Sequence, residues 1–538
     1  METVAQAFAK TAAENPDRPC IQVPARPGRD YAAEGLDWSY GEVREMAATL
    51  RQSYAAAGYG HGHRIAILLE NRPSFVLHWL ALNALGVSVV PINPDYPPDE
   101  IRNIVSRSGA LLALTLAQRA DDLAAAVAGL EPAPPVVASE WLEHQLPSAR
   151  REPLDSPPGR QSESGLLFTS GTTGWPKGCV LSNEAFFSNG QRYIEAGGIM
   201  AVEHGAERLF NPLPLYYANA FAITNVAMIL AAGCMIFPDR FHPASFWREI
   251  VETDATIMHY LGIIPPLLLR QEPVPEETQQ RLKFGGGAGI DPQQHHQWEE
   301  RFGFPLVEFF GMSEVGICSA TNVEPRKVGS RSVGRPLPGI EYRLVDDQDG
   351  EVGVDEPGQL LVRRAGPEPG LGLFSGYLDE PETTAEVWCG GWFHTGDVMR
   401  RDGDGLYYFV DRLKHMIRRS GQNIPAAEVE EVLRAHPAVE QVACVAAPDE
   451  LRQEEVLACI IPAPDSLADE AGANSIMDWA LERLAYFKAP GWIIFVDTLP
   501  TTNTQKLQKN RIFEAHENPL DRPGCIDLRG RKKRQASG

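Results

Sequence analysis

The residues between 166 and 180 combine the side chains that bind phosphate groups most readily. An apolar run leads into a stretch of hydroxyl and glycine residues: Thr169, Ser170, Gly171, Thr172, Thr173 and Gly174. Glycines let the backbone N–H groups of such a loop point inward, hydroxyls add donors, and Lys177 adds a positive charge. We therefore predict a loop that binds a polyphosphate. It is not a Walker A loop, because Pro176 and Cys179 replace residues of that motif, which disfavours a P-loop kinase or ATPase.

A second segment, EFFGMSE at 308–314, can hold an aromatic ring. Phe309 and Phe310 offer aromatic faces beside Gly311, which has no side chain, and an adenine ring can stack in such a space. The glycine-rich segment 285–290 can close the other side of the ring without steric bulk. Two phenylalanines alone are more typical of a hydrophobic core, so the serine and glutamate that follow them carry the functional interpretation.

In their order along the chain, these segments resemble the AMP-forming adenylating enzymes, which include acyl-CoA synthetases, aryl-CoA ligases, beetle luciferases and peptide-synthetase adenylation domains. The resemblance continues through GRPLPG at 334–339, GWFHTGD at 391–397, YFVDRLKHMI at 408–417, the segment 421–428, and LPTTNTQKLQK at 499–509. With the N-terminal lobe it spans nearly the whole chain. The segment FHPASFWREI at 241–250 adds a fainter similarity to carnitine- and crotonobetaine-type CoA ligases.

The resemblance implies that several motifs bind ATP and AMP. The implied binding residues are Thr169, Ser170, Gly171, Thr172, Thr173, Gly174, Lys177, Gly287, Ala288, Phe309, Phe310, Gly311, Met312, Ser313, Asp397, Arg412 and Lys506. Within this set Ser313 is implied to contact the α-phosphate and Asp397 to bind the ribose hydroxyls, while the adjacent Glu314 is implied to hold Mg²⁺. A carboxylate suits both acidic positions, because Mg²⁺ prefers oxygen ligands and ribose hydroxyls donate hydrogen bonds. A guanidinium such as that of Arg412 binds phosphate or ribose oxygens.

By the same resemblance the catalytic residues are Lys506, Ser313 and Glu314. When a carboxylate attacks the α-phosphorus, negative charge grows on the phosphoryl oxygens and on the departing pyrophosphate, and an ammonium placed there lowers the barrier. The family has glycine before this lysine, whereas this chain has Gln505, which disfavours a left-handed turn. Lys509 is the alternative candidate for the same role.

The acyl pocket is assigned by position in the family pattern. The residues expected to line it are Tyr217, Asn219, Leu261, Gly262, Val315 and Gly316, together with Gly287. Many family members carry histidine where this chain has Tyr217, which keeps bulk and a hydroxyl but loses a group that titrates near neutral pH. We expect altered substrate geometry, and a small or medium organic acid, aromatic acids included, as the substrate.

The resemblance implies two half-reactions. A carboxylic acid and Mg-ATP first give an acyl-adenylate and pyrophosphate; a small domain then rotates about Lys414, and the thiol of coenzyme A displaces AMP. Arg418, Gly421 and Gln422 are implied to bind coenzyme A. Two alternatives stay open at this point: an adenylating enzyme with another acceptor (a carrier protein, an amine or oxygen), and a catalytically silent nucleotide-binding homologue.

The elements that must position these residues alternate between helices and strands. A helix is predicted at 40–59, a strand at 64–69, a helix at 74–85 and a strand at 87–91, which indicates βα units around a mostly parallel sheet. Farther along, the pattern predicts a helix from Pro425, strands at 442–447 and 456–461, a helix at 476–484 and a strand at 493–496. We predict a large α/β N-terminal domain of βα-layered subdomains and a small α+β C-terminal domain joined by a hinge.

We place the large domain at residues 1–411, with a weak internal break at 131–160. The hinge is expected at 412–414, and the mobile small domain at 415–520. The segment 521–538 ends in a basic run and is predicted to be a disordered tail.

Composition excludes several other classes of protein. The 538 residues are 43% hydrophobic and 22% charged, which excludes collagen-like, coiled-coil and wholly disordered chains, and a net charge of −22 disfavours a nucleic-acid partner. The uncharged run 220–237 predicts a buried helix that turns at Gly233 into a strand, not stable membrane insertion. Eight scattered cysteines and the lack of a signal-peptide pattern favour a cytoplasmic enzyme; homo-oligomerisation is left open.

Overall fold

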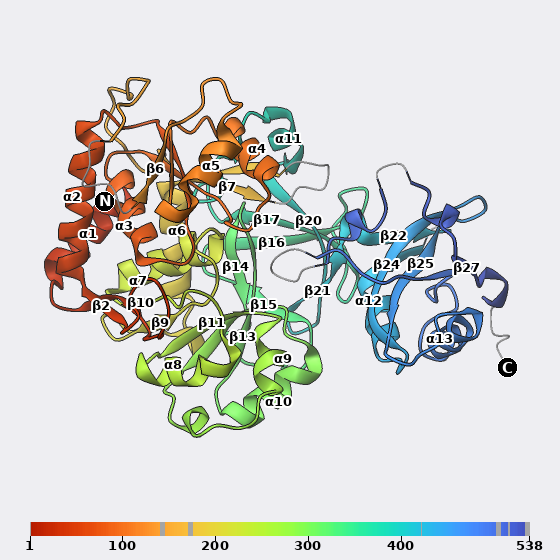
Figure 1. Ribbon diagram of the computed structural model, residues 1–538. Helices are drawn as coiled ribbons and strands as arrows, with labels where there is room; N and C mark the ends of the chain where they lie inside the picture. The colour runs from red at the N-terminus through yellow and green to blue at the C-terminus, as the bar shows by residue number, and fades with distance from the viewer. Residues whose placement is uncertain are drawn as a thin grey trace. The chain divides into compact units, whose positions relative to one another are not determined.

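The computed structural model describes residues 2–139, 146–169, 176–420, 422–501, 507–514 and 517–532. They form two compact units (Figure 1): a large unit of Met1–Tyr342 with Val362–His394, and a small unit of Arg343–Leu361 with Thr395–Gly538. The strands β16 (Ile340–Val345), β17 (Gly358–Arg364) and β20 (Trp392–Arg401) each contain residues of both units. The structure therefore divides the chain at residue 395, and the hinge at Lys414 stays a prediction.

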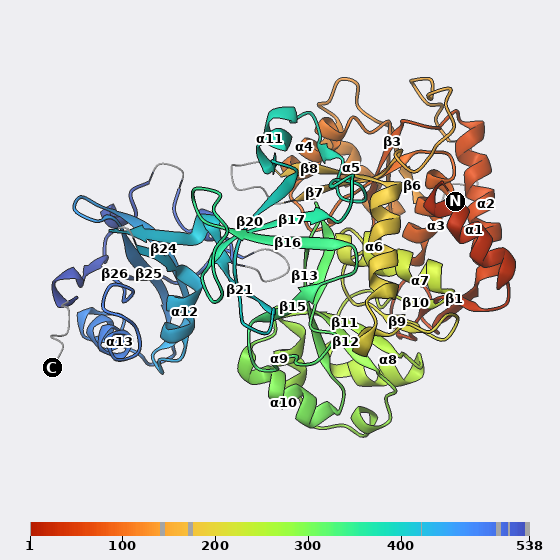
Figure 2. The same cartoon turned by 180° about the vertical axis from the view of Figure 1, so that it is seen from behind.

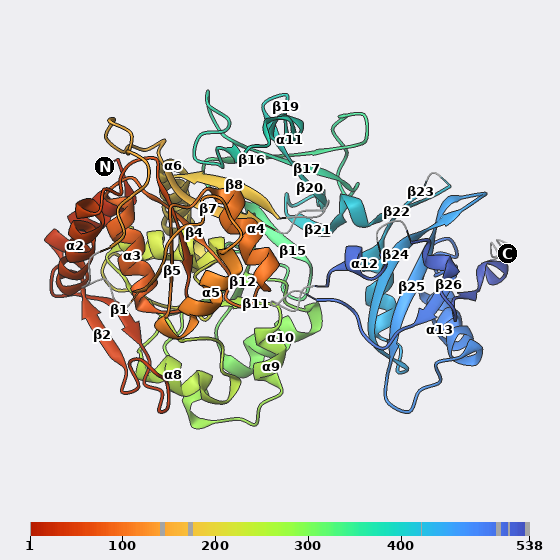
Figure 3. The ribbon, with the colours of Figure 1, turned by 45° about the horizontal axis from the view of Figure 1, so that its top comes forward.

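A seven-stranded sheet of the large unit carries the ends of the predicted phosphate loop. Its strands follow the order β18-β8-β7-β4-β3-β5-β6. Their bounds are β3 (Arg64–Leu68), β4 (Ser88–Pro91), β5 (Leu112–Thr115), β6 (Val136–Ala138), β7 (Glu163–Thr169), β8 (Lys177–Ser182) and β18 (Gly376–Tyr377). Apolar residues of α4 (Pro98–Ser108) and α5 (Ala120–Val127) pack on one face of this sheet (Figure 3).

The helices of the first lobe lie where the sequence predicts them. α2 (Tyr40–Ala56) begins at a capping box, in which the Ser39 hydroxyl accepts from the Glu42 N–H and the Glu42 carboxylate accepts from the Ser39 N–H. α3 (Pro73–Asn83) is buried on nearly every side, in keeping with its mostly apolar sequence. The neighbouring helices of the large unit are α1 (Val4–Glu14), α6 (Asn183–Glu195) and α11 (Pro381–Val387).

A second sheet of the large unit follows the order β15-β14-β13-β12-β11-β9-β10-β1-β2. Its bounds are β1 (Pro19–Val23), β2 (Leu36–Ser39), β9 (Arg208–Phe210), β10 (Cys234–Ile236), β11 (Ile257–Leu261), β12 (Phe284–Ala288), β13 (Leu306–Met312), β14 (Gly316–Ala320) and β15 (Ser332–Pro336). The strands β9, β11, β12 and β13 are mutually parallel. Their carboxyl ends therefore meet at one edge of the sheet.

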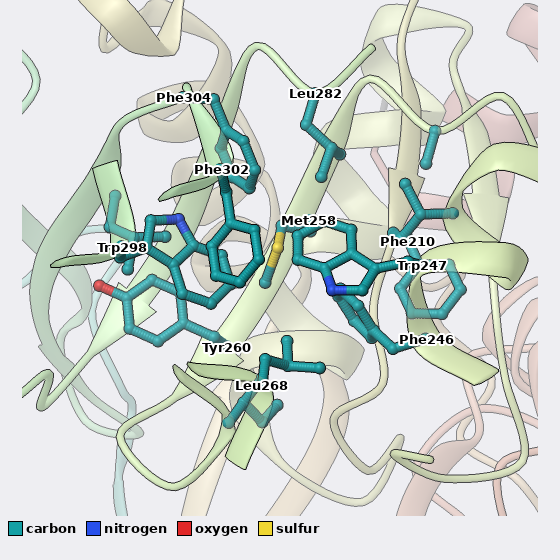
Figure 4. Close-up of a cluster of buried hydrophobic side chains, with 14 of the residues drawn as sticks. Phe210, Phe246, Trp247, Met258, Tyr260, Leu268, Leu282, Trp298, Phe302 and Phe304 are labelled. Carbon is teal, nitrogen blue, oxygen red and sulfur yellow. The ribbon is translucent and has the colours of Figure 1, made fainter. Parts of the chain in front are cut away.

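An aromatic core holds this parallel region rigid. Helices α8 (Phe246–Glu252), α9 (Ile264–Leu269) and α10 (Pro292–Phe302) supply many of its side chains. Figure 4 shows the rings of Trp247, Trp298 and Phe302 gathered around Met258. The ring centroid of Phe302 lies 4.5 Å from those of both tryptophans. Close packing of this kind fixes the positions of the strands above it.

The uncharged segment 220–237 forms buried structure, as predicted. A π-helical turn (Asn219–Thr224) continues into α7 (Asn225–Ala231), and β10 follows. The left-handed residue that ends the helix is Ala232, with φ +53°, rather than the predicted Gly233. A Cβ on Gly233 would lie 2.7 Å from the Met228 sulfur, so close packing requires glycine there. Within the described residues, no helix has both the length and the apolar character needed to cross a bilayer.

The small unit is an α+β module, as the sequence predicts. Its elements are β21 (Tyr407–Arg412), β22 (Met416–Arg419), β23 (Gln422–Pro425), α12 (Ala426–Arg434), β24 (Val439–Asp449), β25 (Gln453–Pro462), α13 (Glu470–Arg483), β26 (Trp492–Phe495) and β27 (Ile526–Asp527). The apolar faces of α12 and α13 pack together on one face of the sheet of β24 and β25 (Figure 2).

The prediction of a disordered tail from residue 521 is wrong for residues 521–532. Strand β27 pairs antiparallel with β26, and a short 3₁₀ turn follows at Arg529–Arg531. Arg529, Arg531 and Lys532 are paired with acidic side chains far away in sequence, which the local charge pattern does not reveal. Residues 533–538 lie outside the described residues.

Candidate active site

Predicted site residues of the large unit gather at the carboxyl ends of the four parallel strands. Leu261 ends β11 and Gly262 follows it, Gly287 and Ala288 end β12, Gly311 and Met312 end β13, and Tyr217 and Asn219 follow β9. The carboxyl edge of parallel strands is where ligands bind in open α/β sheets. The structure thus brings together nucleotide-binding and acyl-pocket candidates that are up to about a hundred residues apart in sequence.

The glycines at this edge are required by close backbone approaches. A Cβ on Gly262 would lie 2.2 Å from the carbonyl oxygen of Gly289, and a Cβ on Gly287 would lie 2.3 Å from that of Tyr260. Distances below 3 Å to backbone atoms cannot be relieved by rotating a side chain. The segment 285–290 therefore packs closely against β11, and its role in binding an adenine ring stays a prediction.

Glu308 fixes this glycine segment from behind, a role the sequence analysis did not assign. Its side chain is buried and accepts hydrogen bonds from the backbone N–H groups of Gly289 (2.9 Å) and Ile290 (3.3 Å) and from the Tyr260 hydroxyl. Burial raises the pKa of Glu308, and the three donors oppose that rise. Glu308 is thus a positioning residue for the predicted adenine-binding segment.

Ser313 and Glu314 lie in the tight turn that joins β13 to β14. The turn is closed by antiparallel pairing of Met312 with Gly316, and Gly316 has φ +69°. The Glu314 carboxylate accepts a 2.9 Å hydrogen bond from the Tyr377 hydroxyl, and the Glu314 carbonyl accepts one from the Phe374 N–H. Burial and the neighbouring Glu314 raise the pKa of Tyr377, so its hydroxyl stays protonated as a donor.

Tyr377 also connects this turn with the predicted phosphate loop. It pairs with Cys179 in the adjacent strand β8, and the ammonium of Lys177 lies 5.1 Å from the centroid of its ring. Thr169 and Lys177 face each other across the β7–β8 pair, so they bracket the loop. The sequence analysis missed Tyr377, because the Gly-Tyr pair at 376–377 does not by itself indicate chemistry.

The Mg²⁺ ion implied by the resemblance fits this turn. Glu314 supplies one carboxylate, while no cluster of three or more His, Cys, Asp or Glu side chains suited to a metal occurs among the described residues. Mg²⁺ is typically held by one or two carboxylates together with the phosphates of a substrate, rather than by a complete protein cage. Glu314 therefore suits a metal that arrives with the nucleotide.

The two phenylalanines of β13 are both 8% exposed. Phe309 packs against the rings of Tyr193 and His259, and a Cβ on Gly286 would lie 2.5 Å from its ring. This ring therefore supports the glycine strand. Phe310 meets the ring of Tyr342 edge-on, with centroids 6.5 Å apart. Each ring is therefore packed against other aromatic side chains, and the stacking of an adenine ring on Phe309 or Phe310 stays a prediction.

A buried chain of hydrogen bonds ends at Asn219. The Leu213 N–H donates to the Asn211 side-chain oxygen, so the Asn211 amide nitrogen donates to Thr224 and to Asn219 Oδ1. Asn219 Oδ1 also lies 3.0 Å from Nδ1 of His259, whose Nε2 lies 2.8 Å from the Tyr193 hydroxyl. Burial lowers the pKa of His259 to about 3, so the ring is neutral. Both contacts are made by Oδ1, so they orient the Asn219 amide with its nitrogen pointing away from Asn211 and His259. This nitrogen has no partner among the described residues.

The remaining acyl-pocket candidates are uncharged and make close contacts with their neighbours. Tyr217 contacts Tyr216, with ring centroids 4.8 Å apart, and burial raises the pKa of Tyr217. Val315 is buried, and its carbonyl accepts from the guanidinium of Arg192. A Cβ on Gly316 would lie 1.5 Å from the Asn189 side-chain oxygen, so no larger residue fits there.

In the small unit, Asp397 and Arg412 face each other across β20 and β21. Arg412 Nε lies 2.8 Å from Asp397 Oδ1, and the Asp397 carboxylate is buried. Burial and Arg412 lower the pKa of Lys414, while Asp397 opposes this effect. The arrangement keeps two cations beside one carboxylate, and the role of Asp397 and Arg412 in binding a nucleotide stays a prediction.

Asp411, which the sequence analysis did not select, ties the predicted hinge to α12. Its carboxylate accepts from the Ala427 N–H at 2.8 Å and from the Arg412 N–H at 2.7 Å. Burial raises the pKa of Asp411, but its hydrogen bonds with His415 and these N–H groups lower it overall. An ionised carboxylate at a helix N-terminus stabilises the helix, so this contact fixes the start of α12 next to Lys414.

The remaining predicted residues fall outside the described residues or lie in the small unit. Ser170, Gly171, Thr172, Thr173, Gly174, Gly421 and Lys506 lie outside the described residues. Arg418 and Gln422 lie on the exposed hairpin of β22 and β23. The alternative lysine, Lys509, is held by Glu430, with Nζ 2.7 Å from Oε1 and the lysine side chain only 9% exposed.

Residues 8–378 match the family described as AMP-binding enzyme, and residues 428–506 match the AMP-binding enzyme C-terminal domain. The chain belongs to the AMP-binding enzyme family. Sulfoacetate–CoA ligase from Cupriavidus necator is 29% identical over 527 residues, covering 95% of this chain and 97% of the relative. Feruloyl-CoA synthase from Amycolatopsis is 30% identical over 487 residues (89% and 94%), and crotonobetaine/carnitine–CoA ligase from Proteus mirabilis is 25% identical over 502 residues (88% and 93%).

Solved structures confirm the predicted fold class. ATP-bound MatB from Rhodopseudomonas palustris superposes with a TM-score of 0.79 at 24% identity, covering 95% of this chain and 98% of that one. The o-succinylbenzoate CoA synthetase from Bacillus subtilis, in complex with its acyl-adenylate, gives a TM-score of 0.80 at 22% identity, with 97% and 99% covered. The predicted resemblance to adenylating enzymes, including crotonobetaine-type ligases, is thereby confirmed.

Proposed function

We propose that this chain is an ATP-dependent carboxylic acid:CoA ligase that forms AMP. The observation that carries the proposal is the gathering of Gly287, Ala288, Ser313 and Glu314 at one edge of a parallel sheet in a chain of the AMP-binding family. The full-length relatives named above are CoA ligases, which supports CoA as the acceptor.

In the first half-reaction, a carboxylate oxygen of the acid bonds to the α-phosphorus of ATP, and the bond to pyrophosphate breaks. Ser313 contacts the α-phosphate, Glu314 holds Mg²⁺, and Lys506 stabilises the charge that develops on the phosphoryl oxygens. Mg²⁺, when bound, neutralises charge on the phosphates. Tyr377 supports this step by holding the Glu314 carboxylate in place.

In the second half-reaction, the sulfur of coenzyme A bonds to the acyl carbon, and the bond from that carbon to AMP breaks. Asp397 binds the ribose hydroxyls and Arg412 stays beside it in both steps. Arg418, Gly421 and Gln422 bind coenzyme A. Lys414 is the point about which the small domain turns between the two steps.

The acyl end of the site accepts an acid that carries a neutral hydrogen-bond acceptor. Asn219 offers an amide donor fixed by Asn211 and His259, and His259 is neutral. A site built to donate a hydrogen bond discriminates against a ligand that cannot accept one. Acids with a carbonyl, ether or hydroxyl oxygen in the acyl group therefore suit it better than hydrocarbon acids.

The direct test measures pyrophosphate release from ATP over a panel of carboxylic acids, each with and without CoA. The proposal requires acid-dependent pyrophosphate and CoA-dependent AMP. ADP formation, or pyrophosphate release that no acid stimulates, would overturn it. CoA-independent AMP release with an amine or carrier protein would change the acceptor and keep the adenylation step.

A matched pair of variants tests the lysine. Lys506→Ala is expected to abolish acid-dependent pyrophosphate release while ATP binding persists, because the charge is needed only in the transition state. Lys509→Ala is the control, since its side chain is already engaged by Glu430. Loss of activity in the Lys509 variant alone would move the assignment by three residues.

A further inference from the structure

The segment 526–532 is built into the small unit. β27 extends the sheet by pairing with β26, and the Leu528 N–H donates to the Gly491 carbonyl. Arg529 lies over the Trp492 ring and pairs with Asp449 at 3.0 Å. These contacts bring the next basic side chain, Lys532, into the interior of the unit.

Lys532 completes a buried cluster of three charges. Its ammonium lies 2.5 Å from Oε1 of Glu455, and it also donates to the Phe487 carbonyl. The other oxygen of Glu455 lies 2.8 Å from Nε of Arg419. The side chains of Glu455 and Lys532 are fully buried, and that of Arg419 is 6% exposed. Glu455 is thus held between two cations in a place that water does not reach.

The backbone is shaped around Glu455. A Cβ on Gly491 would lie 2.3 Å from Cγ of Glu455 and 3.1 Å from Cγ of Arg529. The Val456 N–H also donates to Glu455 Oε1 at 2.9 Å. A carboxylate confined in this way has no second position to move to if one of its cationic partners is lost.

Arg419 is the last residue of β22 and lies next to two implied CoA-binding residues: Arg418 precedes it in the strand, and Gln422 begins β23. Arg419 pairs with Gln422 across the hairpin, and Ser420 within the turn has φ +48°. The turn is attached to the start of β25 by two further contacts: the Ser420 N–H donates to the Arg452 carbonyl, and the Arg418 N–H donates to the Glu454 carboxylate. Of the contacts that hold this hairpin against β25, the Arg419–Glu455 ion pair is the buried one.

We propose that Lys532 is a positioning residue for coenzyme A: through Glu455 it fixes Arg419 and with it the β22–β23 turn that binds coenzyme A. The inference rests on the proposed function, because the role of Arg418, Gly421 and Gln422 is part of it. Without the ammonium, Glu455 keeps a single cationic partner, and the orientation of Arg419 is no longer determined from both sides.

The test separates the two half-reactions. Lys532→Met keeps the length of the side chain and removes its charge. We expect acid-dependent pyrophosphate release without CoA to stay within about twofold of the unmodified chain, and the KM for CoA to rise about tenfold or more. Arg531→Met is the matched control, because Arg531 belongs to the same segment but pairs with the exposed Asp478; its KM for CoA should not change.

A second variant covers the case in which Lys532→Met does not fold. Arg419→Lys keeps the positive charge and removes the geometry that links Glu455 to the turn, and the same selective rise in KM for CoA is expected. Lys532→Arg, which retains the charge, should recover much of the affinity for CoA. If either of the first two variants slows both half-reactions by the same factor, or leaves the KM for CoA unchanged, the proposal is wrong.

These outcomes are distinct from failure of the proposed function. If the unmodified chain releases no AMP in response to CoA with any acid, the assignment of CoA as acceptor fails before the variants are compared. If the unmodified chain forms thioester and the variants behave as the control does, only the role of Lys532 fails.

Discussion

The two units bury a glutamate in opposite ways. Glu308, behind the glycine strand of the large unit, is surrounded by dipoles: two backbone N–H groups and a tyrosine hydroxyl. Glu455, in the small unit, lies between the cations of Arg419 and Lys532. The two N–H groups that bond to Glu308 come from one glycine segment, whereas the two cations beside Glu455 come from segments 36 residues before it and 77 residues after it.

The difference teaches where each region is vulnerable. The two N–H groups bonded to Glu308 belong to the glycine segment that Glu308 positions, so they come into place together with that segment. The charge of Glu455 depends on a segment that joins the unit 77 residues later. A buried charge that loses a partner destabilises the fold. The stability of the small unit therefore depends on residues 526–532 as well as on its sheet.

The largest effect is expected from removing the carboxylate of the dipole-bonded glutamate. Glu308→Ala leaves the Tyr260 hydroxyl and the N–H groups of Gly289 and Ile290 buried without their acceptor. Each such group costs about 1–3 kcal/mol, so the free energy of unfolding should fall by several kcal/mol, and acid-dependent pyrophosphate release should fall about 100-fold. Urea unfolding and the pyrophosphate assay measure the two effects.

The control for that prediction is Glu308→Gln, which keeps the size of the side chain and one acceptor oxygen. Its losses of stability and of pyrophosphate release should be intermediate, because the amide NH₂ group faces donors where the second carboxylate oxygen accepted a bond. If the alanine variant retains pyrophosphate release within about twofold, Glu308 does not position the glycine segment for catalysis.

What the sequence could predict follows the same division. The motif residues at 285–290 and 308–314 are contiguous, and their chemistry can be inferred from residue type, so Gly287, Ser313 and Glu314 were selected as candidates, which stay predictions. Their supports were not: Tyr377 and His259 reach the site from other strands, and neither lies in a motif that suggests a partner. Helices and strands were predicted because local apolar periodicity specifies them.

The tail shows the limit of charge patterning. A run of arginines and lysines from Arg529 onward reads as a solvated segment when only neighbouring residues are considered. Its counter-charges, Asp449, Glu455 and Asp478, lie 50 to 80 positions earlier and come together with it only in the folded sheet. No local pattern contains that information.

The second prediction concerns buried histidines of the large unit that are kept neutral. Burial lowers the pKa of His78, which contacts the Tyr54 hydroxyl, to about 4, and that of His259 to about 3. Below pH 6.5 the unfolded chain binds protons that the folded chain does not, so stability falls as the pH drops from 6.5 towards these values. Between pH 6.5 and 5 each histidine should lower the free energy of unfolding by about 2 kcal/mol.

His78→Gln isolates this effect, because the amide can still bond to Tyr54 but does not titrate. Urea unfolding at pH 6.5 and pH 5 should show a smaller loss of stability in the variant than in the unmodified chain, by about 2 kcal/mol. Equal losses in the two proteins would mean that His78 takes up a proton in the folded state, and that the interior of the large unit is less strictly neutral than its contacts indicate.

The smallest effect is expected at Asn219, where the buried chain of hydrogen bonds ends. Asn219→Leu keeps approximate size but removes the amide donor that Asn211 and His259 orient. Two acids of similar shape, one with a methoxy oxygen and one with an ethyl group in its place, should differ about tenfold in kcat/KM with the unmodified chain and become nearly equal in the variant. The ratio within each protein cancels any general loss of folding.

Asn219→Asp sharpens the test, because a carboxylate keeps both incoming bonds at one oxygen and presents an acceptor with the other. Acids with an amino group should then gain relative to the methoxy acid. If all ratios stay constant while total activity falls, Asn219 completes the buried chain of hydrogen bonds but does not contact the acyl group of the substrate.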